Sequence, residues 1–162
     1  MTVETHITFK DFLNFNFKNS LPRLILFSLI ILAVLGLNFY NTEVETKEIF
    51  RSAIIWFAVL FVFIVFRSYF RLKNAFYSNK KIQEKIIYTF TEEKVQTKGE
   101  TFDGDFSWNT IYRVKENKDW FLIYQSKTTM NMIPKKYFTK NQIQELRSLI
   151  LKNNVKAKLR ND

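Results

Sequence analysis

Few side chains of this sequence are of the types that perform acid–base or nucleophilic chemistry. The single histidine, His6, has no Ser–His–Asp pattern around it, and there is no cysteine to act as a nucleophile or a zinc ligand. The three glycines stand apart, so there is no phosphate-binding glycine loop. Asp103-Gly104-Asp105 could touch a cation, but the pattern is more typical of a turn or bulge. We therefore expect no enzymatic activity, no cofactor and no metal site.

Basic side chains are the functional groups that the chain supplies in excess. Residues 1–66 carry five basic and five acidic groups, whereas residues 67–162 carry twenty basic and ten acidic groups. Such a cluster can bind anionic lipid headgroups, at about 1 kcal/mol for each basic side chain. The expected contacts to lipid or to a partner are Arg67, Arg71, Lys73, Lys80, Lys81, Lys135 and Lys136. The alternative is that these charges only set membrane orientation.

A nucleic-acid partner is not expected from this basic region. It contains no RNA-binding or helix-turn-helix signature. Positive charge next to a membrane span already has an explanation in membrane topology. Membrane lipids and a cytoplasmic or integral membrane protein are the partners that remain, with no oligomeric state assigned.

The first of two long uncharged segments has the length and composition of a membrane span. Residues 24–42 are nineteen uncharged residues, of which twelve are Leu, Ile, Val or Phe. At roughly −0.3 to −0.6 kcal/mol each, these twelve contribute about −5 kcal/mol toward membrane insertion. A cleaved signal peptide is the competing interpretation, but Glu4 and Asp11 precede the segment and no small-residue cleavage site follows it.

The second uncharged segment, residues 52–66, is fifteen residues long and lies between two arginines. Its length alone also fits a buried core helix. Eleven of the fifteen residues are Ile, Val, Leu or Phe on all sides of a helix, and the flanking arginines can snorkel to the headgroups. We therefore expect a second span over about 50–70. Because no Gly or Pro follows, the helix should continue to Tyr77 and stop at Ser78-Asn79.

The charges that flank the two spans predict their orientation. The connecting loop, residues 41–50, holds Glu43, Glu45 and Glu48 against Lys47, whereas basic residues follow the second span. Positively charged loops stay in the cytoplasm, so both termini are expected there and the connecting loop outside. Abundant Phe, Ile, Lys and Asn indicate an AT-rich bacterial genome. The expected location is therefore the bacterial plasma membrane, as an integral protein with two spans.

Short alternating runs after residue 81 are typical of β-strands. The expected strands cover residues 86–90, 94–98, 101–108, 111–115, 120–125 and 128–133, separated by short polar turns. Six strands with tight connections predict an antiparallel meander. The alternation assigns core positions to Trp108, Trp120, Leu122, Tyr124, Met130 and Met132.

A helix is expected to follow the strands over residues 139–152. Thr139 as N-cap and Gln142 at the third helical position form a capping box. The helix carries one apolar stripe, so it should lie across the end or face of the sheet. Residues 153–162 are expected to be a solvated tail.

The segment before the first span has its own alternation. Residues 2–7 are expected to form a strand that joins the main sheet. Thr8 and Asp11 resemble a weaker capping box for a short helix before the span. The apolar face of that helix, which includes Phe9 and Phe12, suits either the membrane interface or core packing, and both interpretations stay open.

The order of residues in the soluble region resembles the YcxB-like family of bacterial membrane proteins. The resemblance is carried by Trp108, Ile111 and Val114, then the strand Phe121 to Tyr124, then Ile133-Pro134-Lys135 followed by Phe138 and a helix. It covers about residues 88–151, and the two preceding spans agree with the family's layout. The resemblance implies a pleckstrin-homology-like (PH-like) domain, in which a bent antiparallel sheet is closed by a C-terminal helix. It implies no biochemical activity.

The expected protein is an α+β membrane protein, with a two-helix transmembrane hairpin and a PH-like antiparallel β domain closed by a C-terminal helix. The expected boundaries are 1–20 for an N-terminal strand and interfacial helix, 21–80 for the hairpin, 81–152 for the β-rich domain and 153–162 for the tail. The leading hypothesis is a noncatalytic binding or regulatory module that presents a basic domain at the cytoplasmic membrane surface. The alternative is an envelope-protective or immunity-type protein that acts through its hairpin.

Overall fold

The computed structural model describes residues 1–40 and 46–161, which divide into two compact units. One unit is a helical hairpin over residues 8–79, and the other is a β-rich domain formed by residues 1–7 and by the chain from residue 80 onward. The hairpin is therefore an insertion between the first two strands of the β-rich domain. Glu43 and Glu45 of the predicted connecting loop lie outside the described residues.

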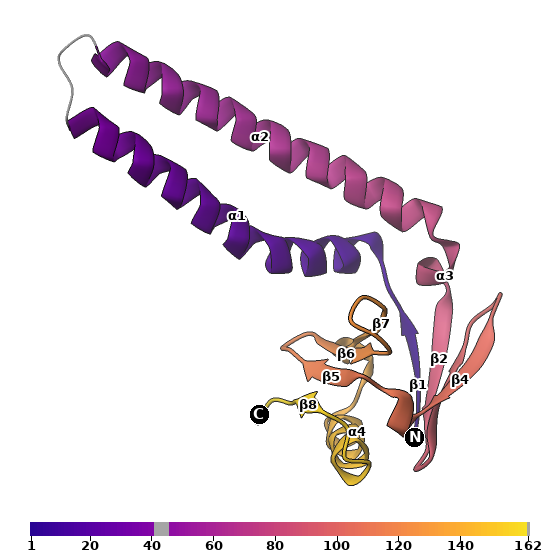
Figure 1. The fold of residues 1–162 in the computed structure, drawn as a ribbon. Coiled ribbons are helices and arrows are strands. Elements are labelled where there is room, and N and C mark those ends of the chain that lie inside the picture. The colour runs from indigo at the N-terminus through magenta and orange to yellow at the C-terminus, as the bar shows by residue number, and fades with distance from the viewer. Residues whose placement is uncertain (41–45, 162) are drawn as a thin grey trace. The chain divides into compact units, whose positions relative to one another are not determined.

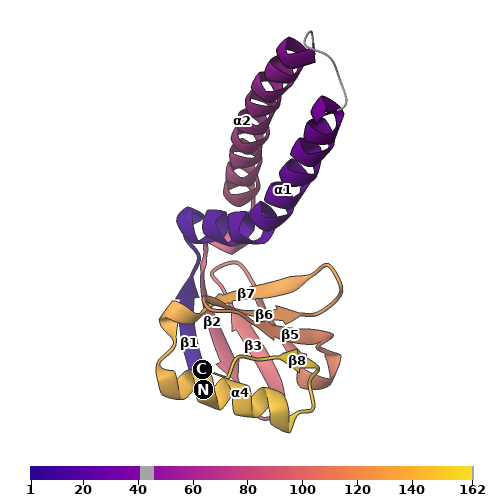
Figure 2. The ribbon, with the colours of Figure 1, turned by 90° about the vertical axis from the view of Figure 1, so that its left-hand side faces the viewer.

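Two long helices, α1 (Phe9–Tyr40) and α2 (Thr46–Ser78), run side by side in the hairpin (Figures 1 and 2). Within α1, the segment Phe9–Val34 contains an 18-residue stretch with a mean hydropathy of 1.6, and within α2, the segment Arg51–Ser78 contains one with a mean hydropathy of 2.2. In these two stretches, no residue is buried. Both helices are long and apolar enough to cross a membrane, and such a surface is unfavourable in water. The end of α2 confirms the predicted extension of the second helix to Tyr77.

The predicted short helix before the first span is not a separate element, because α1 runs without interruption through Pro22. The predicted capping box is present. The Thr8 hydroxyl accepts from the Asp11 N–H at 3.2 Å, and the Asp11 carboxylate accepts from the Thr8 N–H at 3.0 Å. A proline inside a helix removes one hydrogen bond and bends the helix without ending it, and α1 is bent in its first half (Figure 1).

Aromatic rings join the start of α1 to the end of α2. The ring centroid of Phe9 lies 5.9 Å from that of Tyr69, 5.7 Å from that of Phe76 and 5.6 Å from that of Tyr77. The Phe12 ring adds a contact of 5.6 Å with Phe76, which is itself buried. Phe9 and Phe12 therefore pack within the hairpin, which favours the packing interpretation of this apolar face.

Four antiparallel strands form the first sheet of the β-rich domain, in the order β1 (Thr2–His6), β2 (Lys85–Phe90), β3 (Lys94–Lys98) and β4 (Asp103–Ser107). Alternate residues of these strands point inward, so that Val3, Tyr88 and Val95 are buried while their neighbours face outward. The pairing of β1 with β2 confirms that the N-terminal strand joins the main sheet despite the long insertion.

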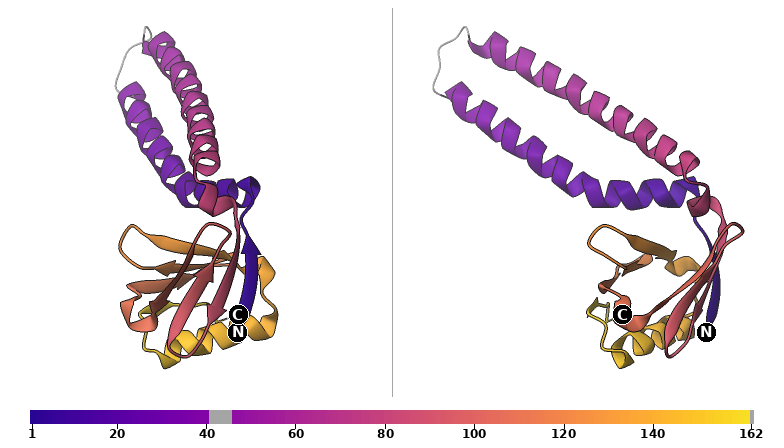
Figure 3. Two further views of the ribbon diagram at one scale, coloured as in Figure 1. Left: turned by 90° about the vertical axis from the view of Figure 1, so that its right-hand side faces the viewer. Right: turned by 45° about the vertical axis from the view of Figure 1, so that its right-hand side comes forward.

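The predicted meander divides into two sheets at a 3₁₀ turn, η1 (Trp108–Thr110). The second sheet has the order β7 (Met130–Pro134), β6 (Trp120–Tyr124), β5 (Arg113–Glu116) and β8 (Ala157–Lys158). Trp108 fixes the break, because its side chain is buried and its indole Nε1 donates to the Thr91 carbonyl at 2.9 Å. The two sheets form separate layers (Figure 3).

Helix α4 (Lys140–Lys152) lies across one end of the strands (Figure 2). Its predicted capping box is confirmed, since the Thr139 hydroxyl accepts from the Gln142 N–H at 3.2 Å and the Gln142 side chain accepts from the Thr139 N–H at 2.9 Å. Leu146 and Ile150 of the apolar stripe are fully buried in the core, where they contact residues of both sheets.

Two predictions about the β-rich domain are wrong. Residues 153–162 are not simply a solvated tail, because β8 pairs with β5 in parallel and Val155 and Leu159 pack against the core. Trp108, Trp120 and Leu122 are buried as predicted, but Tyr124, Met130 and Met132 are only half-buried. The core cluster takes the opposite face of β6, so that its fully buried members include Phe121, Ile123 and Ile133.

Candidate binding surface

The seven predicted basic contacts come from three elements. Arg67, Arg71 and Lys73 are exposed on α2, Lys80 and Lys81 are exposed on α3 (Lys80–Gln83), and Lys135 and Lys136 belong to η2 (Lys135–Tyr137). The first three therefore lie in the hairpin and the other four in the β-rich domain. Within the β-rich domain their environments differ, because only some of them face solvent.

Lys135 points inward to a buried carboxylate, that of Glu116, whose side chain is 0% exposed. One carboxylate oxygen accepts from the Lys135 ammonium at 2.5 Å and from the Arg147 guanidinium at 2.7 Å. The other oxygen accepts from Arg147 Nε at 2.9 Å and from the Arg160 backbone N–H at 3.1 Å. We call this set the Glu116 cluster; it joins β5, η2, α4 and the C-terminal segment.

The charge state of Glu116 follows from these contacts. Burial alone raises the pKa of this carboxyl, but the hydrogen bonds from Arg147, Lys135 and the Arg160 N–H outweigh it and lower the pKa below its usual value. Glu116 is therefore ionised at neutral pH. Because the Lys135 ammonium is held by this carboxylate and its side chain is 11% exposed, we leave Lys135 out of the proposed contact surface.

The other three lysines of this group collect at one end of β1. His6 at the end of β1 pairs with Lys85 at the start of β2, directly after α3, and the Tyr137 hydroxyl of η2 donates to the His6 carbonyl at 2.8 Å. This brings Lys80, Lys81 and Lys136 to the end of the β-rich domain where the chain leaves for the hairpin and returns from it. The positive charge therefore lies next to the covalent connection.

A second group of cations, which the sequence did not predict, lies on the second sheet. The Arg113 guanidinium carbon is 4.5 Å from the ring centroid of Tyr124 and 5.5 Å from that of Tyr112. The Lys115 ammonium is 6.0 Å from the same Tyr124 ring, and Lys158 of β8 pairs in register with Lys115. We call these five residues the Arg113 patch.

The cations of the Arg113 patch have no acidic partner among the described residues. Arg113 Nε is buried without a hydrogen-bond partner, and none of its three cations forms an ion pair within residues 1–40 and 46–161. Tyr112 is 43% exposed, so the patch reaches the surface. A guanidinium stacked on aromatic rings is pre-organised to bind a carboxylate or phosphate through two parallel hydrogen bonds.

The patch could not be found from the sequence because its members are assembled by strand register. Arg113 pairs with Tyr124 across β5 and β6, and Lys158 reaches the patch only through the parallel β8. The dipeptide Tyr112-Arg113 is the local signal that was available. An aromatic residue beside an arginine is common, so the signal becomes specific only once the opposing tyrosine is known.

His6 was the candidate for catalysis, and Asp103 and Asp105 were the candidates for cation binding. Nδ1 of His6 has no hydrogen-bond partner among the described residues, and no serine or carboxylate forms a triad with the ring there. Asp105 is bound by the Lys94 ammonium at 2.5 Å, and Asp103 pairs in register with Lys98. Among residues 1–40 and 46–161, no three His, Asp or Glu side chains are grouped to hold a metal ion.

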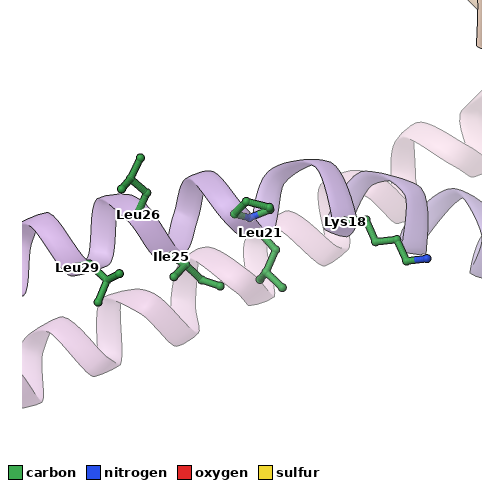
Figure 4. Close-up of a pocket in the computed structure, with 6 residues that line it drawn as sticks. Lys18, Leu21, Ile25, Leu26 and Leu29 are labelled. Atoms are coloured by element: carbon green, nitrogen blue, oxygen red, sulfur yellow. The ribbon is translucent and has the colours of Figure 1, made fainter. Parts of the chain in front are cut away.

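A recess of about 550 Å³ opens beside Pro22 on α1, with Lys18, Leu21, Ile25, Leu26 and Leu29 around it (Figure 4). All of its lining residues come from one helix, and every one except Lys18 is apolar. This recess offers apolar contact and no arrangement of polar groups that would select a ligand.

Comparison with known proteins identifies one domain. The family model described as YcxB-like protein matches residues 90–150. The relative named "Uncharacterized protein YcxB" from Bacillus subtilis (strain 168) is 28% identical over 147 residues, which are 90% of this chain and 72% of the relative. No solved structure matches the chain.

Proposed function

From the premise that this chain carries the domain of the YcxB-like family, we propose that it is a noncatalytic binding module anchored in the bacterial plasma membrane. The hairpin holds the β-rich domain at the cytoplasmic surface, and the Arg113 patch binds an acidic segment of a partner protein. The lysines at the connected end of β1 bind anionic headgroups and so add to the attachment of the domain to the membrane.

The strand order supports a PH-like fold for the β-rich domain. Strands β1 to β4 form one sheet, β5 to β7 belong to the second, and a C-terminal helix follows, as the family resemblance implies. The two long apolar helices support membrane insertion. The described basic residues at the connected end of the hairpin, among them Arg67, Arg71 and Lys73, support a cytoplasmic location for that end.

The observation that carries the proposal is the Arg113 guanidinium, which lies over the rings of Tyr112 and Tyr124 and has no acidic partner among the described residues. In the Glu116 cluster of the same domain, a comparable arginine has a carboxylate. Leaving Arg113 and Lys115 without one has a cost that a bound acidic group would offset. A partner side chain of Asp or Glu has the geometry that this patch can bind.

The test is photo-crosslinking from the exposed edge of the patch, in membranes that contain the full chain. A photoreactive phenylalanine derivative replaces Tyr112, and the crosslinked proteins are identified with and without Arg113→Gln. We expect one partner whose crosslinking falls by tenfold or more in the variant, which corresponds to the roughly 1.5–3 kcal/mol of a hydrogen bond to a charged group. The yield should also fall at high salt.

Lys98→Gln is the matched control, because Lys98 is an exposed cation on the outer face of the first sheet. It should leave crosslinking unchanged. A crosslink to lipid alone, or an equal loss in both variants, would contradict binding of an acidic partner at the patch.

The orientation can be tested in the same chain because it has no native cysteine. A cysteine at Glu48 should react with a membrane-impermeant thiol reagent in intact cells, whereas one at Asp103 should react only after permeabilisation. Labelling at Asp103 alone in intact cells would reverse the proposed topology.

A further inference from the structure

A groove between the two helices of the hairpin has the lining of a site for an amphiphile. It has a volume of about 410 Å³ and is lined by Asn16, Phe17, Asn19, Ser20, Leu21, Arg23, Leu24 and Phe27 of α1 and by Ile64, Val65 and Ser68 of α2. Both helices contribute, in contrast to the recess beside Pro22, which α1 lines alone. The groove is therefore a feature of the hairpin and not of one helix surface.

The lining changes from polar to apolar along the helices. Leu24, Phe27 and Ile64 belong to the uncharged segments, whereas Asn19 and Ser68 lie beyond the ends of those segments. The change occurs at Arg23 on α1 and beside Arg67 on α2. Arginines at both span ends place this level at the boundary between acyl chains and headgroups.

We call the polar part of the groove lining, at Asn16, Asn19, Ser20, Arg23 and Ser68, the rim. Some of its hydrogen-bond donors have no acceptor among the described residues. The side chains of Asn16 and Ser20 are already used, because they donate to the carbonyls of Phe12 and Asn16 at 2.8 Å each. The side chains of Asn19, Arg23 and Ser68 make no hydrogen bond or ion pair to any described residue. An amide, a guanidinium and a hydroxyl at the rim therefore have no partner among the described residues.

The charge of the rim selects the ligand. Arg23 is the one ionisable residue in the lining, and no Asp or Glu contributes to it. A phosphate with an attached acyl chain matches both parts, with its anionic group at the rim and its chain along Leu24, Phe27 and Ile64. We propose that this groove binds an anionic phospholipid, whose phosphate contacts Arg23, Asn19 and Ser68. The inference rests on the membrane location in the proposed function but not on the Arg113 patch.

The experiment uses the full chain, purified in mild detergent, and measures lipid binding by native mass spectrometry. Phosphatidylglycerol and phosphatidylcholine with the same acyl chains are compared, since both carry a phosphate but only the first has a net negative charge. We expect one phosphatidylglycerol bound in preference to phosphatidylcholine. Arg23→Gln should lower that preference about fivefold, the factor that corresponds to about 1 kcal/mol for a basic side chain near anionic lipid.

Two further variants keep the outcome interpretable. Arg51→Gln is the matched control, because Arg51 is an exposed arginine at the other end of the hairpin and should leave the preference unchanged. Ser68→Leu keeps the positive charge but fills the rim, so it should weaken binding of both lipids. The inference fails if Arg51→Gln acts like Arg23→Gln, or if Ser68→Leu leaves lipid binding unchanged.

Two further measurements distinguish a bound phospholipid from other occupants of the groove. They are competition by free glycerol phosphate and the oligomeric mass of the protein. Glycerol phosphate lacks an acyl chain and should not displace the lipid; displacement by it would overturn the role of the apolar half of the groove. A dimer that carries no lipid would show that a second copy fills the groove instead.

Carbonate extraction of the membranes separates this inference from the proposed function. If the chain is released by alkaline carbonate, the membrane anchor fails and the inference fails with it. If the chain stays in the membrane but shows no preference for phosphatidylglycerol, only the lipid site is overturned.

Discussion

Glu116 is a residue whose ionised side chain joins four separate segments of the β-rich domain. Its carboxylate binds side chains that follow it by 19 and 31 positions in the sequence, and a backbone N–H that follows it by 44. A buried charge of this kind is tolerated because each oxygen has two donors. Removing the charge would deprive the partly buried Lys135 and Arg147 side chains of this carboxylate.

Glu116→Gln should therefore destabilise the domain by about 3 kcal/mol, the cost typical of breaking a buried ion pair from one side. The measurement is urea unfolding of the full chain in detergent micelles, followed by tryptophan fluorescence. Glu93→Gln is the control, because Glu93 is exposed and its side chain makes no ion pair among the described residues; it should shift stability by less than about 0.5 kcal/mol. Equal urea unfolding midpoints for the two variants would contradict a stabilising role of the Glu116 cluster.

The effect should depend on pH in one direction. The pKa of Glu116 is lowered in the folded chain below its value of 4.5 in the unfolded chain. Its contribution to stability is therefore complete above about pH 4.5 and is lost as the pH falls through the lower, folded pKa. The difference between the wild type and Glu116→Gln should shrink in that acidic range. A difference that grows on acidification would contradict the assigned charge state.

At the level of secondary structure, α4 depends on an N-terminal capping box that was predictable from the sequence. The Thr139 hydroxyl and the Gln142 side chain satisfy two N–H groups that no helical carbonyl can reach. Thr139→Ala should cost about 1 kcal/mol and lower the melting temperature by about 4–8 °C, followed by circular dichroism. Thr139→Ser keeps the accepting oxygen and should retain most of the stability. An equal loss in both variants would mean that the methyl group, not the cap, is responsible.

Strands and helices were predictable wherever local pattern alone decides them. The strands β2 and β3 and the helix α4 follow from alternation or capping, and the structure places them within a residue or two of the expected bounds. The break at Trp108 and the pairing of β8 were not predictable, since each depends on a distant partner. Trp108 donates to Thr91, and β8 pairs with β5 more than forty residues earlier. The same dependence on register hid the Arg113 patch.

For the whole molecule, the decisive feature is that β1 precedes the hairpin yet belongs to the β-rich domain. The Phe90 N–H donates to the Met1 carbonyl at 2.8 Å, and the Met1 side chain packs against the core cluster. A fragment that starts after the hairpin lacks this strand. The exposed edge of β2 would then be open to aggregation.

We expect residues 82–162 alone to aggregate or to unfold without cooperativity. Joining residues 1–7 to residues 80–162 through a short glycine-serine linker should instead give a soluble domain, because the paired residues His6 and Lys85 lie within a few positions of the ends that the linker joins. Size-exclusion chromatography and thermal circular dichroism compare the two. Val3→Asp in the joined protein, at a buried position of β1, should abolish the gain. Equal behaviour of the two fragments would show that β1 is dispensable.

Local sequence patterns were sufficient to predict the two apolar helices, most of the strands and the capped C-terminal helix, because each depends on residues that are near neighbours in the chain. The sequence also placed the excess positive charge beyond residue 66. Which of those charges face solvent depends on the three-dimensional fold, which turns Lys135 toward Glu116 and places Arg113 over the rings of Tyr112 and Tyr124. The reason is that burial and pairing depend on distance in space, and strand register brings residues together that no local pattern connects.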